Sequence, residues 1–160
     1  RDCTKSHHDY LTTKALTLEN SFPESASVSG SQPAALSIVQ NLLANAVNYT
    51  PPSGRIQCRI DRVATEVRLT LTNTNPGLEA TDLPKLWEPF WRRDAARTDR
   101  AHSGLGLALV HELARTHGWD VTASLPTPDW FQVELLMPAA SPVNQTSSNL
   151  DRTDTPADAS

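Results

Sequence analysis

The sequence predicts a two-layer α+β sandwich, in which a mixed, mostly antiparallel sheet carries helices on one face. Two observations predict this fold class. Segments with alternating apolar and polar residues occur in pairs joined by short links, which is typical of β-hairpins. Two longer segments with helical apolar periodicity stand between these strands. Because hairpins outnumber crossovers, we expect the helices to gather on one face of the sheet.

The first half of the chain begins with a strand and a helix. "ALTLEN" (15–20) predicts the strand, and Pro and Gly interrupt the loop at 21–32. Ser31 is the expected N-cap of the helix, and Pro33 suits its first turn. "TPPSG" (50–54) ends the helix. The predicted apolar stripe of this helix consists of Leu36, Val39, Leu43 and Val47.

The second half contains two predicted hairpins and a second helix. In "RIQCRID", the apolar residues Ile56, Cys58 and Ile60 alternate with polar ones. A long irregular region (74–103) follows the first hairpin, and a loop of this length is usually functional. The expected elements are strands at 55–61, 66–73, 120–125 and 130–138, a short helix near 82–87, and a helix at 104–118 that ends near Gly118.

The domain organisation follows from composition along the chain. We expect residues 1–13 to be the end of an upstream linker or helix, and residues 14–138 to be one domain. Residues 139–160 are rich in Ser, Thr, Asn, Asp and Pro and lack aromatic residues, which predicts a disordered tail. The sequence starts at Arg1 and its single Met is Met137, so we expect a piece of a longer protein.

Composition narrows the possible functions. The 160 residues carry a net charge of −4, which argues against nucleic-acid binding. No apolar run is long enough to span a bilayer, so we expect no direct membrane contact by this chain. Cys3 and Cys58 are far apart and form no metal or redox motif, and Cys58 has the pattern of a core residue.

Three asparagines in the first helix form the first candidate site. Asn41, Asn45 and Asn48 are four and three residues apart, so they lie on one stripe of the helix. Their neighbours are apolar, with no Lys or Glu from 33 to 54. Amide oxygens suit Mg²⁺, and the ring of Tyr49 could pack against a base. The alternative is a plain solvent-exposed polar face.

The second candidate site is the junction of the long loop with the second helix. Gly104 and Gly106 allow close approach of a ligand, and the free N–H groups of a helix start favour phosphate. The preceding "WRRDAARTDRAH" contains four arginines, whose planar guanidinium groups suit phosphate. The alternatives are an ordinary loop-to-helix junction and a solvated charged loop.

The order of these motifs resembles one known family. "NLLANAVNYTPPSG", "NPGL", "LWEPFWRRDAAR" and "SGLGLALV" resemble the N, G1, F and G2 boxes of the ATP-binding catalytic domain of sensor histidine kinases. The wider superfamily includes gyrase B, the Hsp90 chaperones and MutL, and its members share the Bergerat-type ATP-binding fold. The resemblance covers about residues 14 to 138.

The resemblance implies ATP and Mg²⁺ as cofactors and assigns a role to each matching residue. Asn45 would ligate the Mg²⁺ that bridges the phosphates, with Asn41 and Asn48 beside those phosphates, while Tyr49 would lie beside the adenine. Arg92 and Arg97 would meet the terminal phosphates. The other implied ATP-binding residues are Asn73, Gly77, Leu78, Ser103, Gly104, Leu105, Gly106 and Leu107.

Three positions depart from the family pattern. Asn73 replaces an Asp that accepts a hydrogen bond from the adenine amino group, which exchanges a charged bond for a neutral one and costs about 1 kcal/mol. The Asn73 oxygen could still accept, and its NH₂ could donate to a ring nitrogen. Asn75 and His102 each replace a glycine, and Asn tolerates left-handed backbone better than most residues.

The implied function is that of a protein-histidine kinase catalytic domain in a two-component system. It would donate the γ-phosphate of ATP to a histidine on an upstream dimerisation domain, from which a response regulator would receive it. We expect a cytoplasmic location, in a parent protein that the inner membrane could anchor, and no catalytic residue within these 160 residues. The alternatives are a degenerate, non-catalytic docking module and an anti-sigma-type serine kinase.

Overall fold

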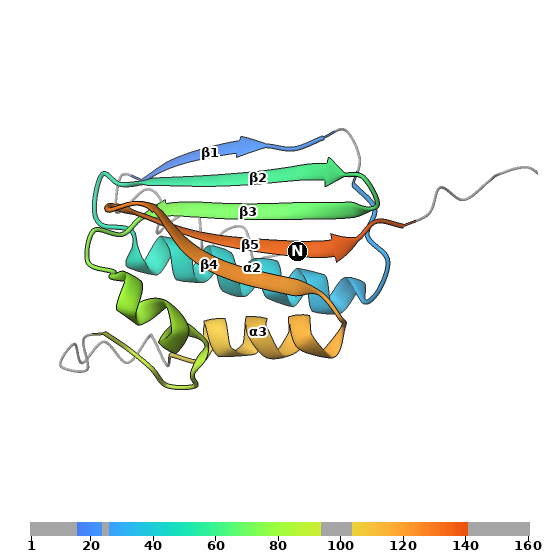
Figure 1. The fold of residues 1–160 in the computed structure, drawn as a ribbon. Helices are drawn as coiled ribbons and strands as arrows, with labels where there is room; N and C mark the ends of the chain where they lie inside the picture. The colour runs from blue at the N-terminus through green and yellow to red at the C-terminus, as the bar shows by residue number, and fades with distance from the viewer. Residues whose placement is uncertain (1–15, 24–25, 94–103, 141–160) are drawn as a thin grey trace, which may run out of the picture.

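The computed structural model describes residues 16–23, 26–93 and 104–140, which form a five-stranded sheet with helices on one face (Figure 1). The predicted arm at 1–13, loop residues 94–103 and all but the first two residues of the predicted tail lie outside this part of the chain. The elements are β1 (Thr17–Ser21), α2 (Gln32–Tyr49), β2 (Arg55–Val63), β3 (Glu66–Thr74), the 3-10 helix η1 (Ala80–Trp87), α3 (Gly106–Thr116), β4 (Asp120–Thr127) and β5 (Trp130–Pro138).

The sheet is mixed and mostly antiparallel, as the sequence predicts. Its strand order is β1-β2-β3-β5-β4. Only the pair β1 and β2 is parallel, and α2 provides the crossover that such a pair needs. The other pairs are antiparallel and include the two predicted hairpins, β2–β3 and β4–β5. Hairpins therefore set the fold class, and the single crossover carries the first helix onto the sheet.

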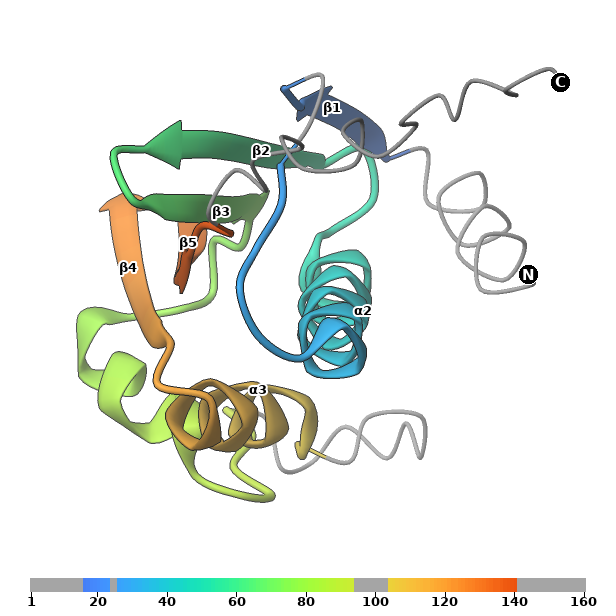
Figure 2. The same cartoon turned by 90° about the vertical axis from the view of Figure 1, so that its right-hand side faces the viewer.

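The core lies between one face of the sheet and the two helices. Register places apolar residues opposite each other, with Cys58 opposite Leu71 and Leu71 opposite Val133. These side chains are buried, and Cys58 is a core residue as predicted. Figures 1 and 2 both show α2 and α3 on the same face of the sheet. The helix-covered face is thus the apolar face of the strands.

The face that α2 buries differs from the predicted stripe. Four of its five buried residues are spaced by four: Ala34, Ile38, Leu42 and Ala46. Leu36, predicted to be in the stripe, is 57% exposed, whereas Val47 is buried and Val39 and Leu43 are partly buried. The helix packs against both β3 and α3, so its buried arc is wide and follows Ile38 and Leu42 rather than Leu36.

The predicted helix ends are largely confirmed. The Ser31 hydroxyl accepts a hydrogen bond from the Ala34 N–H at 3.3 Å and caps α2. Helix α3 begins at Gly106, two residues later than predicted, because Gly104 has a φ of +69° that no helix contains. Gly118, with a φ of +65°, follows its C-terminal end. No helix in the described ranges combines the length and apolar character needed to cross a membrane.

Candidate functional site

The asparagine stripe of α2 faces the first turn of α3. The Asn41 Nδ2 donates to the Ser37 carbonyl at 2.8 Å, and a Cβ placed on Gly106 would lie 3.4 Å from the Asn41 Oδ1. The amide oxygen therefore points at the start of α3, within van der Waals contact distance of such a Cβ. Asn45 and Asn48 continue this stripe and are half-buried. The fold thus brings together Asn41 and Gly106, which are 65 residues apart in sequence.

The start of α3 is a row of backbone donors on a constrained turn. The first N–H groups of any helix lack partners within the helix, and the N-cap residue Leu105 makes no capping hydrogen bond with its own side chain. A Cβ on Gly104 would lie 2.9 Å from both the Phe90 carbonyl carbon and the Trp91 oxygen. Only glycine fits this turn. Leu107 is buried, whereas Leu105 is 41% exposed.

The two ends of the long loop are tied together at its base. The Phe90 N–H donates to the Gly104 carbonyl oxygen at 3.0 Å. Phe90 has a φ of +66°, which a bulky residue adopts only under local constraint, and its side chain is 71% exposed. The predicted loop residues Arg97, His102 and Ser103 lie outside the described part of the chain. In the described part of the chain, the base of the long loop is therefore held by backbone contacts around Gly104.

Asn73 lies at the opposite end of the site, against the C-terminal end of α2. It is 2% exposed and points from β3 toward the helices. Its Nδ2 donates to the Thr50 hydroxyl oxygen at 3.2 Å and to the Thr74 carbonyl at 3.1 Å. Both amide protons are therefore used within the protein. The expectation that this NH₂ could donate to a ring nitrogen is wrong, and the oxygen alone is left to accept.

The turn after β3 corrects the expectation for Asn75. None of the residues Asn75, Pro76 and Gly77 has a positive φ, so asparagine replaces glycine here without backbone strain. The Asn75 N–H donates to the Asp129 carbonyl at 2.8 Å, which fixes the turn against the β4–β5 hairpin. Gly77 has open space around its Cα, whereas Leu78 is buried. Leu78 therefore anchors the turn, and Gly77 leaves room above it.

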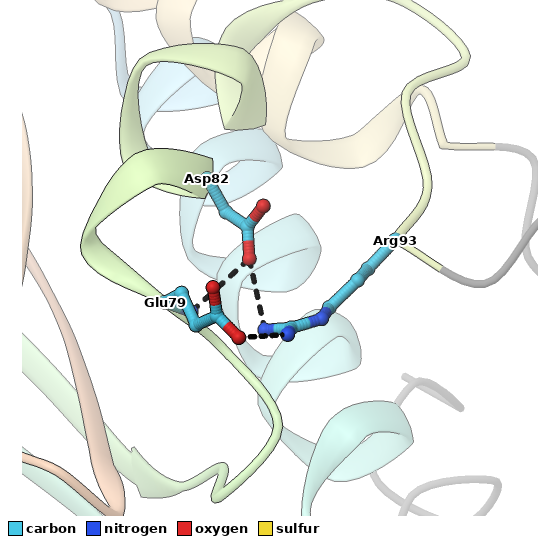
Figure 3. Close-up of polar contacts among 3 residues, drawn as sticks. All are labelled: Glu79, Asp82 and Arg93. Carbon is cyan, nitrogen blue, oxygen red and sulfur yellow. Dashed lines mark hydrogen bonds and ion pairs between the residues drawn. The ribbon is translucent and has the colours of Figure 1, made fainter.

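Two arginines stand where the long loop leaves η1. Arg92 is half-buried. Arg93 is held by two carboxylates, with its Nη2 2.5 Å from the Glu79 Oε1 and its Nη1 2.9 Å from the Asp82 Oδ2 (Figure 3). The hydrogen bond to Glu79 is the main cause that raises the pKa of the Arg93 guanidinium. Arg93 thus fastens the start of the loop to η1.

The outer face of the sheet has a hollow of its own, with a volume of about 640 Å³. Polar side chains of β2, β3 and β5 line it, and Arg68 pairs there with Glu134 at 3.6 Å. It lies on the side of the sheet away from the helices, so it is separate from the asparagine stripe. Its polar lining is the usual solvated face of an antiparallel sheet.

Sequence reasoning missed two contributors to the site. Thr50, which is 1% exposed, was expected only to stop the helix, yet its hydroxyl contacts Asn73. The sequence signal for Thr50 was its position directly after Tyr49, a predicted site residue. In the structure Tyr49 is 45% exposed at the same helix end. Glu79 and Asp82 are the second contributor, and their acidic side chains within "LEATDL" (78–83) gave no distinct signal.

Comparison with known proteins identifies the family. Residues 30–141 match the sequence model of the family described as "Histidine kinase-, DNA gyrase B-, and HSP90-like ATPase". The chain belongs to this family. The matched range contains every described residue of the candidate site, from Asn41 to Leu107.

The similar proteins are sensor kinases. The chain is 32% identical over 113 residues to the signal transduction histidine-protein kinase BaeS of Escherichia coli (strain K12), and the alignment covers 70% of this chain and 24% of BaeS. It is 32% identical over 117 residues to the probable sensor histidine kinase TcrY of Mycobacterium tuberculosis (strain ATCC 25618 / H37Rv), covering 72% of this chain and 24% of TcrY. The chain thus spans about a quarter of the length of these relatives.

Solved structures share the fold. The mycobacterial sensor histidine kinase MprB superposes with a TM-score of 0.71 at 25% identity, covering 85% of this chain and 92% of that one. Full-length ShkA in complex with AMPPNP superposes with a TM-score of 0.72 at 19% identity, covering 86% of this chain and 28% of that one. The predicted fold, and the interpretation of the chain as the ATP-binding catalytic domain of a sensor histidine kinase, are confirmed.

Proposed function

We propose that this domain binds Mg²⁺·ATP between α2 and α3 and that its parent protein transfers the γ-phosphate to a histidine on an upstream dimerisation domain. The observation that carries the proposal is the Asn41 amide oxygen directed at Gly106, at the start of α3. An amide stripe opposite a row of helix N–H groups gives a triphosphate both donors and a metal ligand. A response regulator would then receive the phosphoryl group.

Each end of the site would hold a different part of the nucleotide. Gly104, Leu105, Gly106 and Leu107 would donate backbone N–H groups to the phosphates, with Arg92, Arg97 and Ser103 beside them. Asn73 would accept from the base, and Tyr49 would cover it, while Gly77 and Leu78 would border the sugar side. Phosphoryl transfer needs mainly positioning and charge neutralisation, which backbone donors and arginines supply.

The residues present fit a magnesium ion that arrives with the nucleotide. Within the described ranges, no group of three or more His, Cys, Asp or Glu side chains could hold a metal. Mg²⁺ commonly takes one or two protein ligands and completes its shell with phosphate oxygens and water. Asn45 is the proposed protein ligand, one turn beyond Asn41 on the same stripe. The ion would neutralise phosphate charge during transfer.

An exposed apolar patch beside the loop suits docking of the acceptor domain. It consists of Phe90, Leu105 and Leu109, which are 71%, 41% and 43% exposed. Leu105 and Leu109 are one helical turn apart, and the Phe90 N–H donates to the carbonyl of Gly104, the residue before Leu105. The acceptor histidine must approach the terminal phosphate, so its domain has to meet this end of the molecule. We propose a cytoplasmic location, where ATP and the regulator are available.

The test is calorimetric titration of the domain with ATP, with and without Mg²⁺, in the parent sequence and in Asn45→Ala. We expect binding that requires Mg²⁺ and falls by at least about tenfold in Asn45→Ala, the usual loss for a metal ligand or its support. Asn20→Ala is the matched control, because Asn20 lies exposed on β1, and it should bind like the parent.

The result also decides between the proposed functions. Absence of ATP binding by the unsubstituted domain would contradict the proposal and leave a non-catalytic docking module. Phosphorylation of a partner on serine by the full-length parent protein would instead identify an anti-sigma-type kinase. The relatives named above are histidine kinases, which supports histidine as the acceptor.

A further inference from the structure

Thr50 joins α2 to Asn73 through a directed hydrogen-bond chain. Its hydroxyl donates to the Ala46 carbonyl at 2.6 Å, and its backbone N–H donates to the same oxygen at 3.0 Å. A hydroxyl has only one proton, so the Thr50 oxygen must act as acceptor toward the Asn73 Nδ2, 3.2 Å away. The direction of the Thr50–Asn73 bond is therefore set by the helix end.

A second acceptor fixes the other amide proton. The Asn73 Nδ2 also donates to the Thr74 carbonyl at 3.1 Å, and a carbonyl can only accept. If the carboxamide were turned over, its oxygen would face the Thr74 carbonyl, and it could bond to the Thr50 hydroxyl only if that hydroxyl gave up its hydrogen bond to Ala46. The Asn73 Oδ1 is thus left as the one group that can meet a ligand. Among the described residues, nothing donates to this oxygen.

Gly54 fixes the side-chain orientation of Thr50. A Cβ on Gly54 would lie 2.4 Å from the Thr50 Cγ2 and 2.8 Å from the Pro51 carbonyl oxygen. The threonine methyl therefore fills the space that glycine leaves, and this directs the hydroxyl toward Ala46 and Asn73. Because Thr50 and Asn73 are 1% and 2% exposed, water cannot easily replace either partner.

We propose that Thr50 is a positioning residue for base recognition. It holds the Asn73 carboxamide with its oxygen toward the nucleotide, so that the site accepts a hydrogen bond from an exocyclic amino group. A base with a carbonyl at that position would meet oxygen with oxygen. The Thr50–Asn73 pair therefore selects adenine over hypoxanthine without a carboxylate. This inference rests on the nucleotide site proposed above.

The first test measures nucleotide preference by calorimetry with Mg²⁺·ATP and Mg²⁺·ITP. The parent sequence should prefer ATP. Thr50→Val keeps the shape of the side chain but removes the acceptor, so its ATP affinity should fall about tenfold while its ITP affinity changes less than about twofold. Thr50→Ser retains the hydroxyl and should keep the parent preference. Equal loss for both nucleotides in Thr50→Val would overturn the inference, because that pattern indicates only general damage.

The second test needs no nucleotide. The two Asn73 side-chain amide protons, observed by NMR, should both exchange slowly in the parent and in Thr50→Ser. In Thr50→Val, one of them should exchange at least about tenfold faster. Equal protection in all three proteins would overturn the positioning role even if ATP binds. Thermal unfolding checks that each variant is folded, and Thr50→Ala replaces Thr50→Val if the valine variant is not.

Failure of the two proposals gives different results. If the parent sequence binds neither ATP nor ITP, the nucleotide site and its selectivity are both wrong, whatever the NMR experiment gives. If the parent binds ATP but Thr50→Val keeps its preference over ITP, only the role of Thr50 is wrong. Gly54→Ala, which would displace the Thr50 methyl, should change the preference in the same direction as Thr50→Val.

Discussion

The two ends of the site are built in different ways. At the base end, Thr50 and Asn73 are almost completely buried, and hydrogen bonds fix the direction of each side chain. At the phosphate end, Gly104 and Gly106 expose backbone N–H groups, and Asn45 is only half-buried. In the proposed nucleotide site, side chains at the base end would distinguish one base from another, whereas the phosphate end would offer contacts that any triphosphate can use. Substitutions at the two ends should therefore change different properties.

The largest expected effect comes from the turn at the phosphate end. Gly104→Ala should lower the affinity for ATP and ITP alike by more than about tenfold, because its Cβ would meet two backbone atoms at 2.9 Å and displace the turn. Gly118→Ala is the matched control, since Gly118 has a similar φ but open surroundings. It should cost about 1 kcal/mol of stability, measured by urea unfolding, without changing binding. Equal effects of the two variants on binding would contradict this account.

The next largest effect concerns docking at the phosphate end. Leu109→Ser, in the full-length parent protein, should slow autophosphorylation about tenfold while ATP affinity stays the same. A fully buried leucine side chain contributes roughly 1.5–3 kcal/mol. A tenfold slower autophosphorylation therefore corresponds to the loss of only part of this contribution. Leu36→Ser serves as control, because it removes a leucine that is also exposed but lies near the start of α2. Loss of ATP affinity in Leu109→Ser would show instead that Leu109 supports the nucleotide site.

Asn73→Asp tests whether the base end is complete as it stands. A carboxylate would strengthen the bond to the amino group by about 1 kcal/mol. It would also lose the two hydrogen bonds donated by Nδ2 and require the Thr50 hydroxyl to turn away from Ala46. These effects oppose each other, so ATP affinity by calorimetry should stay within about fivefold of the parent. A gain of more than tenfold would mean that asparagine impairs the pocket.

The smallest expected effect is at Arg93. Arg93→Ala removes ion pairs with Glu79 and Asp82, and because the guanidinium lies in solvent, the free energy of unfolding should change little. Arg115→Ala removes an exposed pair with Glu112 far from the loop and is the control. A loss of ATP affinity in Arg93→Ala but not in Arg115→Ala would show that the anchored loop start contributes to the phosphate end.

The sheet could be predicted from the sequence, but the buried face of α2 could not. Alternation with a period of two sets which face of a strand is buried, so the hairpin containing Cys58 follows directly from the sequence. In α2, apolar residues surround much of the helix, and packing against two neighbours decides which of them are buried. Periodicity alone therefore selected Leu36, which is exposed, in place of Ile38.

For the site, the order of the motifs was informative and side-chain orientation was not. The resemblance of that order to a known family implied that Asn41 and Gly106 serve one site, and the structure brings them together. The orientation of the Asn73 amide depends on Thr50 and on a carbonyl in its own strand, which no local pattern reveals. Likewise, the backbone at Asn75 is set by a hydrogen bond to Asp129, a residue 54 positions later.

The two faces of the sheet make the domain convenient to label. The outer face is polar and separate from the helices, so a fluorophore there would leave the nucleotide site untouched. Ser124→Cys would supply an exposed thiol on β4 by a nearly isosteric change. Burial raises the pKa of the Cys58 thiol, which keeps it protonated and slow to react with maleimides or iodoacetamides. With Cys3→Ser, a single dye per molecule would then allow binding to be followed at low protein concentration.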